Sequence, residues 1–192
     1  FGFDEFRSGQ REIIDAVSSK KNVLAIMPTG GGKSLCFQLP ALMSEGLTVV
    51  ISPLIALMRD QVRGLQAAGV AAGALTSGNT EDETDAVFSE IYAGKLKILY
   101  VAPERLASSA MQSALFRFNV KSLVVDEAHC VSQWGHDFRP DYLRIGELRK
   151  RLGVPLAAFT ATADKETRKE ITERLFDGVA PKVFLHGFDR PN

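Results

Sequence analysis

A glycine-rich stretch near the start of the chain has the composition of a phosphate-binding loop. Pro28-Thr29-Gly30-Gly31-Gly32-Lys33-Ser34 follows an apolar run, residues 23–27, and precedes a segment with helical spacing of apolar residues. Glycines let backbone N–H groups close around phosphate oxygens, and the helix N-terminus adds free donors. Lys33 can reach the β- and γ-phosphates of a nucleotide, and the Ser34 hydroxyl can bind magnesium. The expected contacts are Thr29, Gly30, Gly31, Gly32, Lys33 and Ser34.

The strict form of such a loop has a glycine where this chain has Met27. The alternative is a glycine-rich turn that binds nothing. The position of Gly32-Lys33-Ser34 between a predicted strand and a predicted helix favours the phosphate site.

An acidic pair supplies the second half of the expected chemistry. Asp126 and Glu127 follow the apolar run Leu123-Val124-Val125. A carboxylate at the end of a strand can hold magnesium through water, so we assign Asp126 to the metal. Its neighbour can orient and deprotonate an attacking water, so we assign Glu127 as the general base. Most acidic pairs are solvated surface or helix caps, but this pair follows a buried strand in a chain that has a phosphate loop.

Apolar runs alternate with amphipathic segments along the whole chain. Strands are predicted for residues 23–27, 47–52, 71–75, 98–101, 122–126, 156–160 and 183–186. Most runs are continuous rather than alternating, which indicates burial on both faces of a mostly parallel sheet. The segments between them have helical spacing, and Thr80 with Glu83 predicts a capping box. The pattern is typical of an α/β domain with helices on both faces, in which ligands bind at the carboxyl ends of the strands.

The composition of the chain bears on its domain number, its partners and its cellular location. Its 192 residues suit one domain, and 45% hydrophobic with 24% charged residues is usual for a globular protein. With 23 basic and 23 acidic residues the net charge is zero, so any nucleic-acid site must be local or completed by further chain. No apolar run is long enough for a membrane span, and the first ten residues are no signal peptide. Only two cysteines occur, Cys36 and Cys130, which favours an intracellular, reducing location, cytoplasmic or nuclear.

Taken together, these motifs resemble the helicase superfamily that includes the DEAD-box and DEAH-box proteins, which tolerates the residue at Met27. Several stretches are closer to the RecQ DNA helicases, and the resemblance covers residues 1–192. The stretches are 1–3 with Phe6, Arg7 and Gln10, then 27–34, 52–54, 60–61, 100–106, 126–142, 160–163 and 188–192. The resemblance implies a RecA-like P-loop NTPase fold, ATP and Mg²⁺ as cofactors, and 3′-to-5′ unwinding of DNA coupled to ATP hydrolysis, with roles in DNA repair and recombination.

The same resemblance implies an adenine site near the N-terminus. Gln10 would read the adenine edge, while Arg7 and Phe3 would pack on its faces, where a guanidinium plane or a ring suits a π-system. The alternative for Phe3 is a core aromatic residue.

Residues 130–140 contain the single tryptophan of the chain together with a phenylalanine and an arginine. Rings and guanidinium groups can stack on unpaired bases, and arginine can hold phosphate. The segment resembles the aromatic-rich loop that links single-strand binding to ATP hydrolysis in RecQ enzymes. The expected DNA contacts are Trp134, Phe138 and Arg139, and the expected couplers are Gln133 and His129, with His136 structural. From composition alone, a hydrophobic plug over the sheet edge is an equal alternative.

Thr160 ends the predicted strand 156–160, and Thr162 follows it. In the family this motif lies between the nucleotide and the DNA-binding surface. The hydroxyls can also cap the next helix, where Asp164 is a candidate N-cap.

Hydrolysis of a phosphoryl group needs a cation to neutralise developing charge, commonly an arginine from another domain. By resemblance, that arginine comes from a second RecA-like domain, to which residues 189–192 would lead. We therefore expect residues 1–192 to be the N-terminal RecA-like domain of a longer protein, with single-stranded or junction DNA as partner and little activity alone. An RNA helicase and a non-catalytic ATP-binding module are the alternatives.

Overall fold

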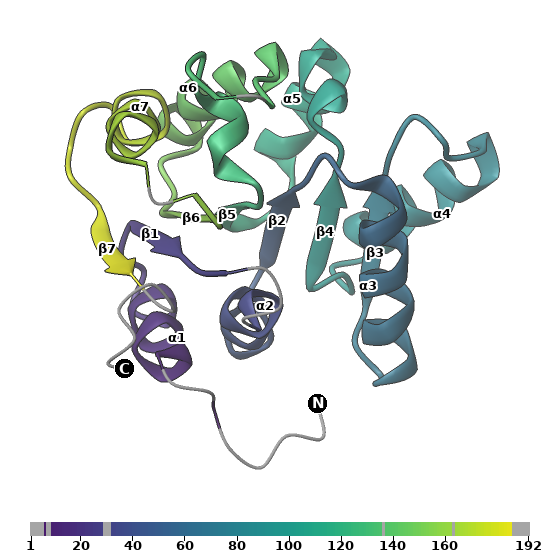
Figure 1. Cartoon of the computed structure of the whole chain (residues 1–192). Helices are drawn as coiled ribbons and strands as arrows, with labels where there is room; N and C mark the ends of the chain where they lie inside the picture. The colour runs from purple at the N-terminus through teal and green to yellow at the C-terminus, as the bar shows by residue number, and fades with distance from the viewer. Residues whose placement is uncertain (1–5, 7–8, 29–31, 136, 163, 186–192) are drawn as a thin grey trace.

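The computed structural model describes residues 6, 9–28, 32–135, 137–162 and 164–185. Within these residues, a sheet of seven strands has helices on both faces (Figure 1). The strands are β1 (Val23–Ile26), β2 (Leu47–Ile51), β3 (Ala72–Leu75), β4 (Ile98–Val101), β5 (Val120–Val125), β6 (Leu156–Thr160) and β7 (Lys182–Leu185). The α-helices are α1 (Gln10–Ser18), α2 (Lys33–Met43), α3 (Ile55–Ala67), α4 (Glu81–Tyr92), α5 (Ser109–Arg117), α6 (Leu143–Leu152) and α7 (Lys165–Leu175). Short 3₁₀ turns are η1 (Pro103–Ala107), η2 (Ala128–Val131) and η3 (Pro140–Tyr142).

The strand order is β3-β4-β2-β5-β6-β1-β7, and each neighbouring pair is parallel. The predicted α/β class and parallel sheet are therefore confirmed. The strand ends agree with the prediction to within two residues, the largest difference being the start of β5 at Val120. Residue 186, predicted as the end of the last strand, lies outside the described residues.

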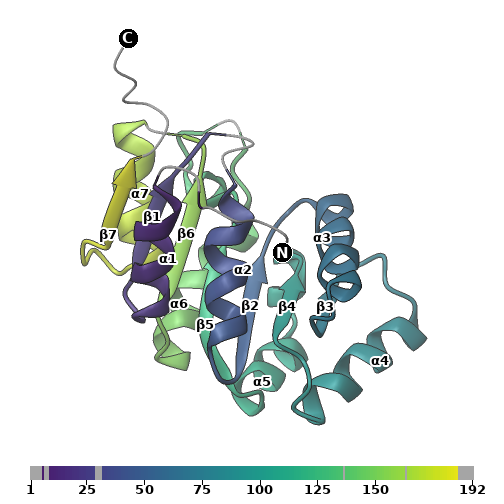
Figure 2. The same ribbon diagram turned by 90° about the horizontal axis from the view of Figure 1, so that it is seen from below.

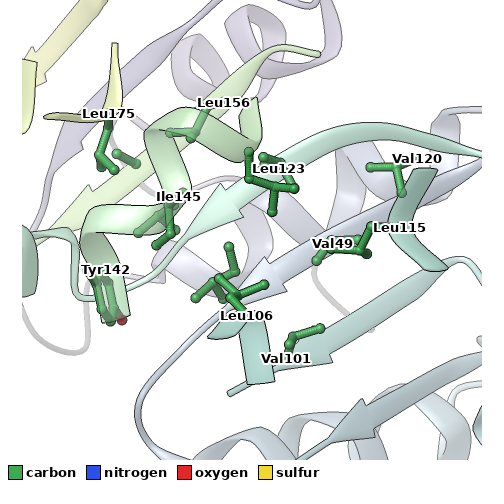
Figure 3. Packing of buried hydrophobic residues seen from close by; sticks show 14 of the residues in the cluster. Val49, Val101, Leu106, Leu115, Val120, Leu123, Tyr142, Ile145, Leu156 and Leu175 are labelled. Carbon is green, nitrogen blue, oxygen red and sulfur yellow. The ribbon is translucent and has the colours of Figure 1, made fainter. Parts of the chain in front are cut away.

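The strands are apolar on both faces because both faces are covered. Alternate side chains of β1 enter different clusters: Leu24 and Ile26 lie on one face, Val23 and Ala25 on the other. The first cluster packs under α5, α6 and α7, where Tyr142, Ile145 and Leu175 meet strand residues (Figure 3). The second packs under α1, α2 and α3, which lie in front of the sheet in Figure 2. Each fully buried aliphatic side chain stabilises the fold by about 1.5–3 kcal/mol, so both helical layers are held firmly.

Two helices begin as the sequence predicts. Thr80 accepts a hydrogen bond from the Glu83 backbone, and the Glu83 carboxylate accepts one from the Thr80 backbone, which completes the capping box of α4. The Asp164 carboxylate accepts from the Glu166 backbone at 2.8 Å and so caps α7. Across the described part of the chain, no helix combines the length and apolar character needed to span a membrane.

Helices α6 and α7 approach each other closely at Gly146. A Cβ there would overlap the backbone carbonyl oxygen of Arg174, so a residue without a side chain is required. This contact helps to fix α7, which follows the site-bearing strand β6.

Candidate functional site

Three of the predicted motifs meet at one edge of the sheet. Strand β6 lies between β1 and β5, with Ile26 aligned to Thr160 and Val125 aligned to Ala158. Because the three strands are parallel, their carboxyl ends share an edge. Met27 and Pro28 follow β1, the acidic pair follows β5, and Thr160 is the last residue of β6. The sheet order therefore explains why segments a hundred residues apart form one site.

Lys33 joins the phosphate loop to the acidic pair. Its Nζ lies 3.2 Å from Asp126 Oδ1 and 3.1 Å from Glu127 Oε1, with all three side chains largely buried. Burial disfavours the charged ammonium group, but the two carboxylates outweigh that effect, so the pKa of Lys33 lies above its usual value. Lys33 is therefore a firmly protonated cation that offsets the charge of both acids.

Asp126 is held from several sides. Its Oδ1 accepts a hydrogen bond from the Glu127 backbone at 3.0 Å, and its carbonyl oxygen accepts one from the buried Tyr142 hydroxyl at 2.9 Å. Burial raises the pKa of Asp126, and the Lys33 ammonium opposes that rise. A carboxylate so oriented can serve as a metal ligand without rearranging.

Glu127 has a left-handed backbone, with φ 54° and ψ 46°. For a residue with a side chain this conformation costs about 1–2 kcal/mol, and such strain is concentrated at functional sites. Here the strained residue is the predicted general base, and its carboxylate contacts Lys33 rather than pointing into solvent.

Two further polar contacts support the phosphate loop. The Gln10 side-chain amide donates to the carbonyl oxygen of Gly32 at 2.9 Å, so α1 is tied to the loop. Gly32 itself has φ 78° and stands at the N-cap of α2, where glycine has no steric penalty. The Gln61 amide, from α3, donates to Ser34 Oγ at 2.9 Å.

The donor set suits a magnesium ion bound together with a nucleotide. Mg²⁺ prefers oxygen ligands and is commonly held by one or two carboxylates plus substrate phosphates. Ser34 and Asp126 supply a hydroxyl and a carboxylate beside the phosphate loop. Among the described residues, no group of three or more His, Cys, Asp or Glu could form an independent metal cage.

His129 connects the acidic pair with Thr160 and the aromatic segment. Its Nδ1 lies 2.9 Å from Thr160 Oγ1 and 3.6 Å from Glu127 Oε2, and its Nε2 lies 3.5 Å from Asp137 Oδ2. Thr160 Oγ1 also accepts from the Thr162 backbone at 3.2 Å. These contacts bring the predicted coupling residues His129, Thr160 and Thr162 to the same place.

The aromatic segment is part core and part exposed surface. Cys130 and Val131 are buried in the first hydrophobic cluster, which matches the plug alternative for the start of the segment. The Trp134 side chain is instead 76% exposed, so it covers nothing. Gln133 and Arg139 are also exposed, and Phe138 is half-buried.

Phe3, Arg7, Thr29, Gly30, Gly31 and His136 lie outside the described residues. Expectations for the adenine-stacking residues and for the first part of the phosphate loop therefore remain predictions.

Three residues that support the site from outside had no predicted role, although residues 61 and 137 lie within the stretches that resemble RecQ helicases. Gln61 contacts Ser34, Asp137 contacts His129, and Glu170 of α7 accepts hydrogen bonds from the aromatic segment. One signal was available for Glu170, because Thr167, Glu170 and Ile171 have the spacing of one buried helix face. A carboxylate on a buried face needs donors, but the sequence does not say which segment supplies them.

This chain belongs to the DEAD/DEAH box helicase family, with which residues 7–171 match. Its curated relatives narrow the family further. Over its whole length it is 48% identical to the ATP-dependent DNA helicase RecQ of Pasteurella multocida (strain Pm70) and 45% identical to that of Bacillus subtilis (strain 168). The chain covers 30% and 33% of these two proteins, so it spans about a third of their length. The resemblance to RecQ helicases is thereby confirmed.

Solved helicase structures share the fold. The match to a hypothetical ATP-dependent RNA helicase from Sulfolobus tokodaii covers 96% of this chain and 54% of the helicase chain. Its TM-score is 0.74, and the sequence identity is 20%. The Hef helicase domain of Pyrococcus furiosus matches 94% of this chain, and 38% of its own is covered, with a TM-score of 0.68 and 20% identity. At such identity the likeness establishes the fold alone, and it confirms the RecA-like prediction.

Proposed function

We propose that this chain is the ATP-binding motor domain of a RecQ-type, 3′-to-5′ DNA helicase, completed by a second RecA-like domain elsewhere in the full-length protein. The proposal depends above all on Lys33, whose Nζ lies within 3.2 Å of both Asp126 and Glu127. Lys33, at the end of the predicted phosphate loop, is therefore in direct contact with the acidic pair. The similarity to RecQ proteins over the whole chain supports DNA as substrate and an intracellular location.

In the proposed reaction Lys33 binds the β- and γ-phosphates of ATP. Glu127 takes a proton from water as the water oxygen bonds to the γ-phosphorus. The bond from that phosphorus to the β–γ bridging oxygen breaks, and ADP leaves with the electron pair. When bound, Mg²⁺ held by Ser34 and Asp126 supplies charge neutralisation at the phosphates.

Coupling to DNA is assigned to His129 and the aromatic segment. His129 contacts Thr160 and Asp137 and lies near Glu127, so it can transmit a shift of the segment to the general base. Trp134 is free to stack on an unpaired base because its indole is largely exposed. Arg139 and Phe138 complete the proposed DNA contact, with Gln133 as a second coupler.

The test is ATP hydrolysis with and without single-stranded DNA, for the 192-residue chain and for the full-length protein. We expect DNA stimulation in the full-length protein only, because the charge-neutralising arginine comes from the second domain. Trp134→Ala should abolish the stimulation without weakening ATP binding. Tyr92→Ala is the matched control, since Tyr92 is 63% exposed but lies at the end of α4.

Two results would contradict the proposal. Equal or stronger stimulation by RNA would assign the domain to an RNA helicase. Absence of hydrolysis in the full-length protein under every condition would leave an ATP-binding module.

A further inference from the structure

Glu170 places a buried carboxylate against the backbone of the aromatic segment. It lies on α7, with 8% of the residue exposed. Its Oε1 accepts a hydrogen bond from Ser132 Oγ at 3.2 Å, and its Oε2 accepts one from the Gln133 backbone N–H at 3.1 Å. Both carboxylate oxygens are therefore used by two consecutive residues of one segment.

Ser132 extends this contact to the tryptophan. Ser132 is fully buried, and its Oγ accepts a hydrogen bond from the Trp134 backbone N–H at 3.2 Å. The hydroxyl thus donates to Glu170 and accepts from Trp134 at the same time. Because hydrogen bonds to a charged acceptor contribute more than neutral ones, the carboxylate is the strong end of this chain of contacts.

Other contacts hold the two ends of the aromatic segment together. The Arg139 backbone N–H donates to the Cys130 carbonyl at 2.8 Å, and Asp137 Oδ2 lies 3.5 Å from His129 Nε2. Glu170 binds residues 132 and 133, near the start of the segment. Between these contacts the Trp134 backbone N–H is bonded to Ser132, although the Trp134 side chain is 76% exposed.

We propose that Glu170 is a positioning residue that holds Ser132 to Trp134 in the conformation that binds single-stranded DNA. The inference rests on the proposed function for its DNA part. An ordered segment loses less conformational entropy on binding than a free one, so the Glu170 contacts strengthen DNA binding without touching DNA. Helix α7 begins three residues after Thr162. The contact between Glu170 and the aromatic segment therefore also connects that segment with the end of β6.

Tryptophan fluorescence measures this effect directly, because Trp134 is the single tryptophan of the chain. We expect Glu170→Ala and Ser132→Ala each to lower the emission anisotropy of Trp134 in the 192-residue chain. Glu170→Gln keeps one acceptor for the Gln133 N–H and should restore part of the anisotropy. Glu173→Ala is the matched control, because Glu173 is exposed on the same helix.

The second measurement uses ATP hydrolysis by the full-length protein. In Glu170→Ala the DNA concentration for half-maximal stimulation should rise about tenfold, as expected for loss of a charge-assisted hydrogen bond. Hydrolysis without DNA and the affinity for ATP should stay unchanged, because Glu170 contacts neither Lys33 nor the acidic pair in the described structure.

The proposal is overturned if Glu170→Ala, folded by circular dichroism, matches Glu173→Ala in anisotropy and in DNA dependence. If Glu170→Ala does not fold, Glu170→Gln and Ser132→Ala decide, and wild-type anisotropy in both rejects the proposal. A wild-type protein whose hydrolysis ignores DNA refutes the helicase assignment instead. In that case the anisotropy series still decides whether Glu170 holds the segment.

Discussion

The side-chain amide of Gln61 donates a hydrogen bond to Ser34 Oγ over 2.9 Å, which joins α3 to the start of α2. The Ser34 oxygen has a second lone pair, which can bind a cation. Gln61→Ala should therefore weaken binding of ATP with Mg²⁺ about fivefold, the usual effect of one neutral hydrogen bond. Calorimetric titration measures the affinity with and without Mg²⁺.

Gln66→Ala provides the comparison for that titration. Gln66 lies on the same helix, but its amide donates to the Ala72 carbonyl of β3 instead. Its replacement should leave ATP affinity unchanged. An equal loss in both variants, or a Gln61→Ala loss that persists without Mg²⁺, would show that Gln61 does not act through Ser34.

Replacement of Glu127 should separate hydrolysis from binding. In the full-length protein, Glu127→Gln should lower the rate of ATP hydrolysis at least about a hundredfold, since a general base contributes a factor of that order. ATP affinity should stay within about threefold, because Lys33 keeps its contact with Asp126. Fixed-time phosphate-release assays measure the hydrolysis rate, and nucleotide titration measures the ATP affinity. A rate near wild type would exclude Glu127 as the base.

The left-handed backbone of Glu127 allows a separate test of stability. Glycine tolerates φ 54°, whereas alanine does not. Glu127→Gly should therefore be more stable than Glu127→Ala by about 1 kcal/mol in urea unfolding, the reverse of their order in a helix. Equal stabilities would mean that the conformation is not strained.

Removal of the Lys33 charge should make stability depend on pH. The raised pKa of Lys33 means that its stabilisation is complete below 10.5 and is lost only as pH rises through the folded-state value. In Lys33→Met, Asp126 loses its cation, so burial raises its pKa further. A carboxyl group whose pKa is raised in the folded state stabilises the fold most when the pH is below its ordinary pKa of 3.8. That contribution is lost as the pH rises from 3.8 through the folded-state pKa.

We therefore expect Lys33→Met to lose about 3 kcal/mol of unfolding free energy near pH 7 and clearly less near pH 4, close to the ordinary carboxyl pKa of 3.8. Urea unfolding at the two pH values measures the difference. Lys150→Met is the control, because the Lys150 pair with Asp177 is more than half exposed and should contribute little at either pH. A pH-independent loss for Lys33→Met would indicate that packing, rather than charge, is responsible.

The same glycine-to-alanine substitution should have opposite effects in two helices. At Gly146 the added Cβ overlaps the Arg174 carbonyl, so α6 and α7 must separate, at a cost of about 1–3 kcal/mol. At Gly64, in α3, no described atom beyond its chain neighbours and the backbone of its own helix lies within 4 Å of the new Cβ, so alanine should stabilise the helix by about 1 kcal/mol. Thermal unfolding of both variants tests the pair, and equal shifts would contradict the close approach of α6 and α7.

Strand and helix positions were predictable because they depend on local patterns. Continuous apolar runs mark strands that are buried on both faces, and Thr80 with Glu83 marks the start of α4. The stretch ending at Lys33 and Ser34 and the acidic pair were recognisable as well, because each combines characteristic residue types with a position after an apolar strand. Gln61 and Glu170 were not assigned contacts, because amide and carboxylate groups have no sequence pattern that identifies a distant partner.

The sequence alone therefore determines the local groups: a predicted phosphate loop ending at Lys33 and Ser34, an acidic pair after an apolar strand, and an aromatic segment around Trp134. The folded sheet adds the order in which β6 lies between β1 and β5, which brings Thr160 to His129 and Lys33 to Glu127. It also adds the packing of α7 that brings Glu170 to Ser132. Hydrophobic burial drives both, and because burial is not directional, an apolar pattern specifies which face is covered but not by which neighbour.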